Sequence, residues 1–137
     1  MDPITILVIE EGPEATLVCS ALARRPEVAV RVVDAPDLGT ALQRLEKQPE
    51  PVALAIAGSN ALKASAGELV TRLSARGIPV VGVATGLSQT ARQRALAAGV
   101  REIYDRPAEW RPYAELIDSL VARFIPAGLP PRQGPTN

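Results

Sequence analysis

Four short apolar runs are spread along the chain, and a segment with helix-like spacing of apolar residues follows each of them. Apolar runs of about four to eight residues predict strands that are buried on both faces. Strands that alternate with helices pair in parallel, because right-handed crossovers place the helices on both faces of one sheet. We therefore predict an α/β fold with strands at residues 4–9, 28–33, 52–57 and 79–84 and a shorter fifth strand at 102–104.

The segments between these strands carry start and stop signals for helices. Pro13 suits the first turn of a helix, because its missing N–H would have no partner there. Ser88 suits an N-cap, and Gly99 is placed to end the helix that Ser88 starts. The last helix has an apolar stripe at helical spacing. The predicted helices are residues 13–25, 38–45, 62–75, 89–98 and 112–124.

The composition changes after Phe124, where prolines and glycines dominate the remaining residues. Such a segment favours neither helix nor sheet. We expect one domain over residues 1–125 and a disordered tail or linker over residues 126–137. A tail of this kind favours a domain that is joined to further chain.

Charge and residue usage exclude several classes of function. Fifteen basic residues balance fifteen acidic ones, so no net field attracts nucleic acid or an anionic membrane. The chain has no histidine, which removes Ser-His-Asp and Cys-His pairs and imidazole metal sites. The lone Cys19 is interpreted as a small apolar helix residue. No apolar run reaches the length of a membrane span and the start is not that of a signal peptide, so we expect a cytoplasmic protein without enzymatic activity.

Four strings of residues, in register with the predicted elements, carry a family resemblance. They are ILVIEE at residues 6–11, IPVV at 78–81, AAGV at 97–100 and Arg106-Pro107. Together they resemble the receiver domain of two-component response regulators, the CheY-like family, over about residues 4–124. The resemblance implies a doubly wound five-stranded parallel sheet in the order 2-1-3-4-5, receiver-like or flavodoxin-like, and a role in signal transduction.

The resemblance also implies which residues stand at the family's phosphorylation site. In that family an aspartate at the end of the third strand accepts a phosphoryl group, helped by Mg²⁺ on neighbouring carboxylates and by a lysine after the fifth strand. Here Ala57 stands in the place of the aspartate, and Arg106 in that of the lysine. Glu10 and Glu11 match the acidic pair, whereas Ala84 replaces the Ser/Thr that moves toward the phosphate. The resemblance therefore implies a degenerate site, with no bound cofactor or metal.

Each of these residues carries an expectation about its surroundings. We expect Ala57 to face solvent near a strand end, so that an aspartate would be tolerated there. Glu10 and Glu11 are expected to be solvated carboxylates. Arg106 is a candidate partner for either glutamate, and the Arg106–Pro107 bond is a candidate cis peptide. Ile103 falls where many members of the family carry a mobile aromatic residue.

A second expectation concerns the surface that such domains use for dimerisation and docking, formed by the fourth helix, fifth strand and fifth helix. Exposed aromatic residues and arginines are typical interface anchors. Tyr113 has an alternative role, which is to pack the last helix on the sheet. The implied partners are a kinase, an output domain or a second copy of the chain. The candidate surface residues are Arg92, Arg94, Arg101, Tyr104, Trp110 and Tyr113.

The leading functional hypothesis is a phosphorylation-independent pseudo-receiver that signals through protein–protein interaction, as the N-terminal domain of a larger response regulator. The alternative is a flavodoxin-like module for a small ligand or nucleotide, because doubly wound sheets bind such ligands at the carboxyl ends of their strands. Gly12, Gly58 and Gly86 follow three strands, but no dinucleotide or P-loop motif is present. A third hypothesis, an unusual phosphoryl acceptor, lacks a nucleophile because no aspartate lies between Asp37 and Asp105.

Overall fold

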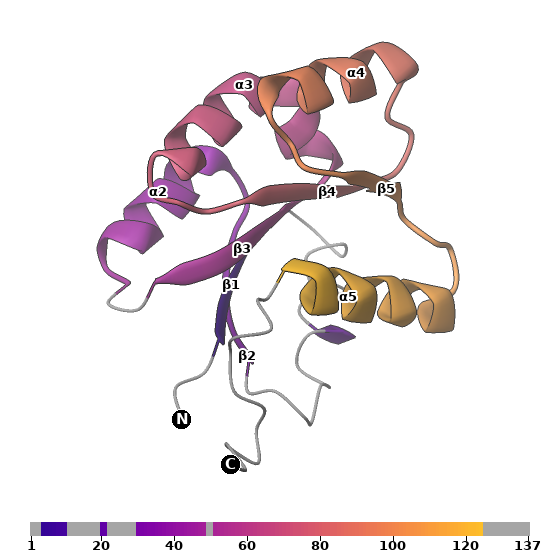
Figure 1. Cartoon of the computed structure of the whole chain (residues 1–137), viewed down its shortest axis with the longest axis horizontal. Helices are drawn as coiled ribbons and strands as arrows, with labels where there is room; N and C mark the ends of the chain where they lie inside the picture. Colours follow the sequence, from indigo (N-terminus) through magenta and orange to yellow (C-terminus); the bar gives the residue numbers. More distant parts are fainter. Residues whose placement is uncertain (1–3, 11–19, 22–29, 49–50, 125–137) are drawn as a thin grey trace.

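The computed structural model describes residues 4–10, 20–21, 30–48 and 51–124 (Figure 1). Its strands form one parallel five-stranded sheet in the order β2-β1-β3-β4-β5. This topology confirms the predicted architecture. The strands are β1 (Ile4–Ile9), β2 (Val30–Ala35), β3 (Val52–Ala57), β4 (Val80–Ala84) and β5 (Ile103–Asp105).

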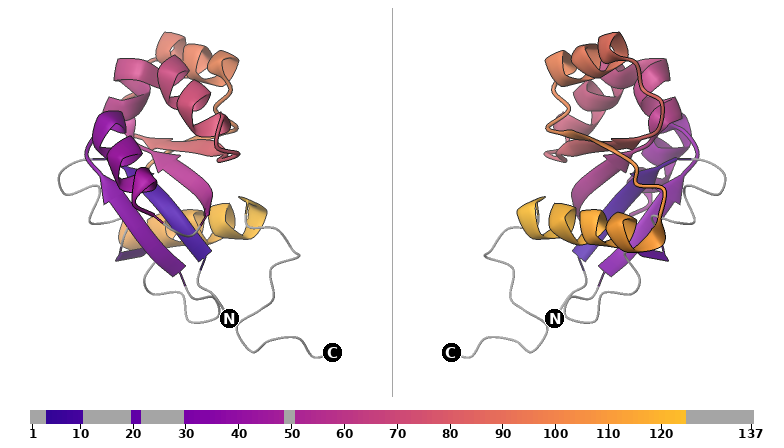
Figure 2. Two further views of the ribbon diagram at one scale, coloured as in Figure 1. Left: turned by 90° about the vertical axis from the view of Figure 1, so that its left-hand side faces the viewer. Right: turned by 90° about the vertical axis from the view of Figure 1, so that its right-hand side faces the viewer.

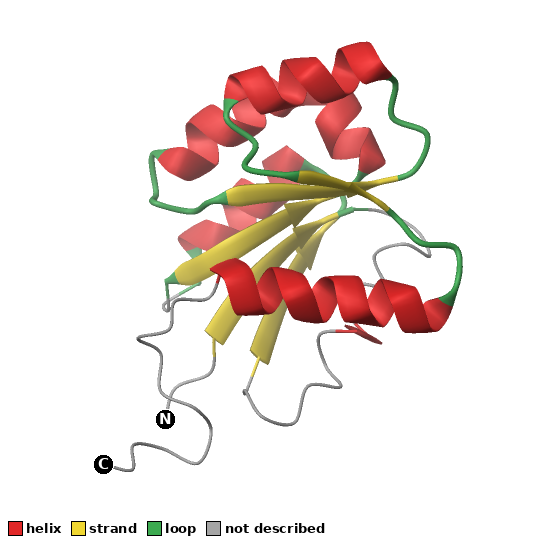
Figure 3. Cartoon of the chain, turned by 45° about the vertical axis from the view of Figure 1, so that its right-hand side comes forward, coloured by secondary structure: helices red, strands yellow, loops and turns green. Residues whose placement is uncertain are grey.

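Helices cover both faces of the sheet, as the crossover connections require. Helices α2, α3 and α4 lie on one face, and α5 lies across the other (Figures 1 and 2). Figure 3 shows the sheet between these two layers. None of the helices in the described part of the chain is long and apolar enough to cross a membrane. Their bounds are α2 (Leu38–Glu46), α3 (Ser59–Ser74), α4 (Gln89–Ala98) and α5 (Trp110–Phe124).

The core consists of two apolar clusters, one on each face of the sheet. Successive side chains of a strand point to opposite faces, so β1 sends Leu7 and Ile9 toward α2–α4 and Ile6 and Val8 toward α5. All six residues of β1 are buried, whereas β2, at the edge of the sheet, is only partly buried. Burial on both faces explains why the central strands are continuous apolar runs rather than alternating ones.

Three predicted boundaries are wrong by two or three residues. Strand β2 ends at Ala35, two residues later than predicted, because its pairing with β1 continues to that residue. Helix α3 begins at Ser59 rather than 62, with Gly58 as its N-cap. Helix α5 begins at Trp110, which places Pro112 in its first turn, where a missing N–H costs no hydrogen bond.

The predicted ends of α4 are confirmed. The Ser88 hydroxyl accepts a hydrogen bond from the backbone N–H of Ala91 at 3.1 Å, and Gly99 adopts a left-handed conformation with φ of 119°. Both are standard ways of satisfying helix ends. Of the predicted helix over residues 13–25, only residues 20 and 21 are described, and both are helical. Cys19, Glu11 and the tail over residues 126–137 lie outside the described residues.

Candidate functional site

The residues that follow β1, β3, β4 and β5 meet at one edge of the sheet, here called the carboxyl edge. Backbone hydrogen bonds extend the sheet one residue past the strands, from Gly58 N to Ile9 O at 2.9 Å and from Arg106 N to Ala84 O at 3.0 Å. The first residue of each loop is therefore held in place by a neighbouring strand. The polar or glycine residues at this edge are Glu10, Gly58, Ser59, Thr85 and Arg106.

Glu10 is buried at the carboxyl edge, with only 5% of its surface exposed. Its Oε2 atom accepts a hydrogen bond from the backbone N–H of Ser59 at 3.2 Å. A Cβ atom on Gly58 would lie 1.7 Å from the same oxygen, so the carboxylate occupies the space that a side chain at residue 58 would need. The expectation of a solvated Glu10 is wrong, because the start of α3 supplies it with a donor and with cover.

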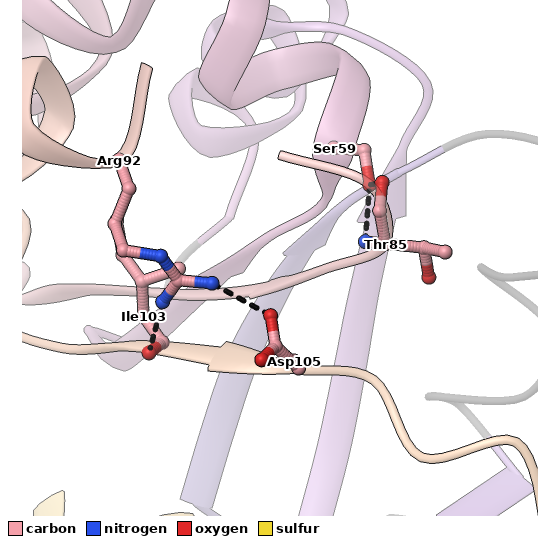
Figure 4. A network of polar contacts seen from close by, with 5 residues as sticks. All are labelled: Ser59, Thr85, Arg92, Ile103 and Asp105. Atoms are coloured by element: carbon pink, nitrogen blue, oxygen red, sulfur yellow. Dashed lines mark hydrogen bonds and ion pairs between the residues drawn. The ribbon is translucent and has the colours of Figure 1, made fainter. Parts of the chain in front are cut away.

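Ser59 joins the start of α3 to the loop after β4. Its hydroxyl accepts a hydrogen bond from Thr85 N at 2.8 Å, and donates one to Thr85 O at 3.2 Å (Figure 4). The residue is nearly buried, at 8% exposed. Both hydrogen-bonding functions of the hydroxyl are therefore used within the protein. A serine hydroxyl whose donor and acceptor functions are both used in this way is poorly placed to act as a nucleophile.

Arg106 completes the set of contacts at the carboxyl edge. Its Nε atom donates a hydrogen bond to the Thr85 hydroxyl at 3.1 Å. Arg106, Glu10, Gly58 and Tyr113 also line one small cavity of about 10 Å³, which has room for at most one water molecule. A positive and a negative side chain thus face the same enclosed space. The Arg106–Pro107 bond is trans, so the expected cis peptide is wrong.

Ala57 and Ala84 are buried within the apolar layer instead of facing solvent. Their exposed fractions are 0% and 1%, and both belong to the core cluster beneath α2–α4. The expectation that Ala57 faces solvent is wrong, because β1 and β4 flank β3 up to its last residue. Neither alanine contributes a polar side-chain atom to the carboxyl edge. The side-chain hydroxyls at this edge belong to Ser59 and Thr85, and the sequence analysis missed Thr85 although it directly follows β4.

Metal binding by the acidic pair depends on residues beyond those described. The described residues contain no group of three or more His, Cys, Asp or Glu placed to hold a metal ion. Mg²⁺ prefers near-octahedral oxygen ligands, and one buried carboxylate that already accepts an amide hydrogen bond is a poor start for such a site. The weak or empty Mg²⁺ site stays a prediction, since Glu11 lies outside the described residues.

Two of the candidate surface residues are used inside the molecule. Arg92 ties α4 to β5, because it donates one hydrogen bond to Ile103 O at 3.1 Å and one to the Asp105 carboxylate at 2.6 Å (Figure 4). The Tyr104 hydroxyl accepts a hydrogen bond from Arg123 of α5, which also pairs with the carboxylate of Glu102, the residue just before β5. These contacts fix α4 and α5 against β5.

The remaining candidate surface residues divide into exposed and buried ones. Arg94 and Arg101 are exposed, and Trp110 is 47% exposed. Tyr113 is only 2% exposed and packs α5 on the sheet, so its place among the surface anchors is wrong. Leu96 on α4 is 43% exposed and was missed, because helical spacing alone did not assign it to either side.

Trp110 borders a shallow groove of about 430 Å³ on α5. The groove is also lined by Ala114 and Asp118, which follow Trp110 at intervals of four residues and share its side of the helix. Arg123, which reaches β5, lies on a different side of α5 by the same spacing. Trp110 and the exposed residues of α4 are therefore two patches rather than one continuous surface.

Comparisons with known proteins connect the fold to one structural class. No protein-family model and no curated protein matches the sequence. The phosphorylated cyanobacterial phytochrome response regulator RcpA matches with a TM-score of 0.75 and 17% identity, over 90% of this chain and 95% of its own. A response regulator in red light signalling of R. palustris matches with a TM-score of 0.74 and 20% identity, over 98% of this chain and 99% of its own. The Mn²⁺-bound response regulator Rcp1 matches with a TM-score of 0.71 and 16% identity, over 91% of this chain and 96% of its own. The chain has the fold of response regulator receiver domains.

Proposed function

We propose that the protein is a phosphorylation-independent pseudo-receiver, a signalling module that acts by protein–protein interaction and catalyses no reaction. The observation that carries this proposal is the state of the carboxyl edge. Strand β3 ends at Ala57, whose side chain is a methyl group. The polar groups of the neighbouring loops are already hydrogen-bonded to one another. A methyl group cannot form an acyl phosphate, and no other described residue on β3 is a carboxylate.

The partner surface is proposed to be the face formed by α4, β5 and α5, here called the 4–5 face. Its support is the exposed Leu96 with Arg94 and Arg101 nearby in the chain, because exposed apolar residues among arginines are typical of interfaces. Trp110, in the separate patch beside the groove on α5, is proposed as the anchor of a second contact. The proposed occupants are a kinase, an output domain or, in a homodimer, a second copy of the chain.

The proposed context is the N-terminal part of a larger response regulator in the cytoplasm. Residues 1–125 form the receiver-like domain in this proposal, and residues 126–137 are the linker to an output domain. The richness of this segment in proline and glycine supports a linker.

The alternative, a module for a small ligand or nucleotide, finds little support among the described residues of the carboxyl edge. Ligand pockets of that kind usually enclose about 300–1,000 Å³. The cavity beside Glu10 encloses about 10 Å³, and the Glu10 carboxylate would repel a phosphate group brought close to it.

A phosphodonor assay tests the absence of phosphorylation. The purified chain is incubated with Mg²⁺ and acetyl phosphate, and its intact mass is measured, with a phosphorylatable receiver domain treated in parallel. We expect no mass increase in this chain and the gain of one phosphoryl group in the control. Stable addition of a phosphoryl group to this chain would overturn the proposal.

Sedimentation velocity tests the 4–5 face through self-association. In a homodimer, Leu96→Glu places a charge in the interface and is expected to shift the chain to monomers. Gln43→Glu, which adds the same charge at an exposed residue of α2, is the control and is expected to leave the association unchanged. Loss of association in the Gln43 variant alone would place the interface on α2 and contradict the proposed 4–5 face.

A further inference from the structure

Helix α3 begins without a side chain of its own to cap it. The first backbone N–H groups of a helix have no partner within the helix, and the N-terminal end carries a partial positive charge. The N-cap of α3 is Gly58, which has no side chain to accept a hydrogen bond. The Glu10 carboxylate, 49 residues earlier in the chain, accepts the N–H of Ser59 instead. The 16-residue helix α3 is thus capped by the residue that follows β1.

Glycine at residue 58 is required by space rather than by backbone conformation. Its φ of −91° is open to any residue. The atoms nearest to a Cβ at this position would be Oε2, Cδ and Oε1 of Glu10, at 1.7, 2.1 and 2.6 Å. All three belong to the carboxylate, which therefore lies directly over the Gly58 Cα atom. Glycine and the buried carboxylate are a matched pair.

The contacts of Glu10 continue into the other loops of the carboxyl edge. Ser59, whose N–H binds Glu10, binds both backbone groups of Thr85 through its hydroxyl. The Thr85 hydroxyl accepts a hydrogen bond from Arg106, which faces Glu10 across the small cavity. One chain of polar contacts therefore joins the loops that follow β1, β3, β4 and β5.

We propose that Glu10 is the built-in anion of the carboxyl edge, and that its carboxylate holds these loops together in place of an added phosphoryl group. The inference rests on the proposed phosphorylation independence, and it names the Glu10 carboxylate as the group that replaces the phosphoryl group. It has a consequence for the ligand class: once the Glu10 carboxylate is removed, the space over Gly58 accepts a small oxyanion such as formate. Glu10 is a positioning residue and takes part in no reaction.

Chemical rescue tests the inference in the full chain. Glu10→Ala is expected to lower the midpoint of thermal unfolding by roughly 5–10 °C, because a charged hydrogen bond to a helix start is lost. Sodium formate, compared with sodium chloride at equal ionic strength, is expected to restore part of that loss with saturation. The wild-type chain and Glu46→Ala, a change at an exposed glutamate of α2, are expected to show no such formate effect.

A second variant keeps the test decisive if Glu10→Ala does not fold. Glu10→Gln retains the size of the side chain and one acceptor oxygen but loses the charge. Its Ser59 and Thr85 amide resonances are expected to shift from their wild-type positions. An unchanged midpoint together with unchanged resonances, or an equal formate effect in the wild-type chain, would overturn the inference. Phosphoryl uptake by the wild-type chain would instead overturn the proposed function, so the two failures are distinguishable.

Discussion

The tight approach of Glu10 to Gly58 makes Gly58→Ala an informative substitution. A methyl group there would lie 1.7 Å from the Glu10 Oε2 atom, so the carboxylate has to leave its position. The side chain itself can rotate, and the cost is the loss of its charged hydrogen bond to Ser59 N, worth about 1.5–3 kcal/mol. Alanine is a poorer N-cap than glycine, but it also restricts the unfolded chain, and these smaller effects roughly cancel. The expected loss of unfolding free energy is about 1.5–3 kcal/mol.

A double-mutant cycle isolates that interaction. Urea unfolding followed by circular dichroism is measured for the wild type, Gly58→Ala, Glu10→Ala and the double variant. In the Glu10→Ala background, the added methyl group is expected to change the free energy of unfolding by no more than about 0.5 kcal/mol, because nothing remains to be displaced. Gly67→Ala, in the same helix with no atom within 4 Å of its Cβ, is the control and is expected to stabilise by about 0.5–1 kcal/mol. Additive effects of the two substitutions would refute the assigned contact.

Substitutions test three further contacts. Gly99→Ala is expected to lower the free energy of unfolding in urea by about 1–2 kcal/mol, because φ is 119° and the new Cβ lies 2.8 Å from Val70 Cγ1. In a Val70→Ala background the steric part of this loss should disappear, and the part due to φ should remain. Arg92→Ala should lower the free energy of unfolding by about 1 kcal/mol, because it removes a hydrogen bond to a β5 carbonyl. Asp105→Ala should hardly change the free energy of unfolding, because the Asp105 carboxylate is 83% exposed. Equal losses in the two variants would contradict these assignments. The hydrogen bond from the Thr40 backbone lowers the pKa of the Asp37 carboxyl below its ordinary value of 3.8. The stabilisation by this N-cap is therefore fully present above pH 3.8 and is lost as the pH falls through the pKa of the folded state. Asp37→Ser should weaken the dependence of the unfolding midpoint on acid pH.

Much of the fold follows from local patterns in the sequence. Four apolar runs identified β1 to β4, since strands buried on both faces need continuous apolar sequence, and the end of each was predicted to within two residues. Ser88 and Gly99 marked the ends of α4 through local capping chemistry. Strand β2 was misplaced because its register is set by pairing with β1, which is not a local property.

The carboxyl edge was predicted in position but not in its contacts. The residues at the strand ends were correctly brought together, yet the burial of Glu10 depends on Gly58 and Ser59, which lie far away in sequence. The resemblance does not point to Thr85, because Ala84 is the residue that matches the family's hydroxyl position. The helical spacing of apolar residues placed Tyr113 in the apolar stripe of α5. Its burial against the sheet shows that it packs the helix and is not a surface anchor.

The central claim is that the carboxyl edge is a fixed set of internal contacts rather than a phosphorylation switch. Amide NMR spectra of the wild-type chain, recorded with and without Mg²⁺ and then with beryllofluoride, test it most directly, because beryllofluoride mimics a phosphoryl group on a receiver aspartate. The account predicts unchanged resonances for Gly58, Ser59 and Thr85 under all conditions. Shifts of these resonances on addition of Mg²⁺ and beryllofluoride would contradict it, and would mean that a working anion or metal site remains.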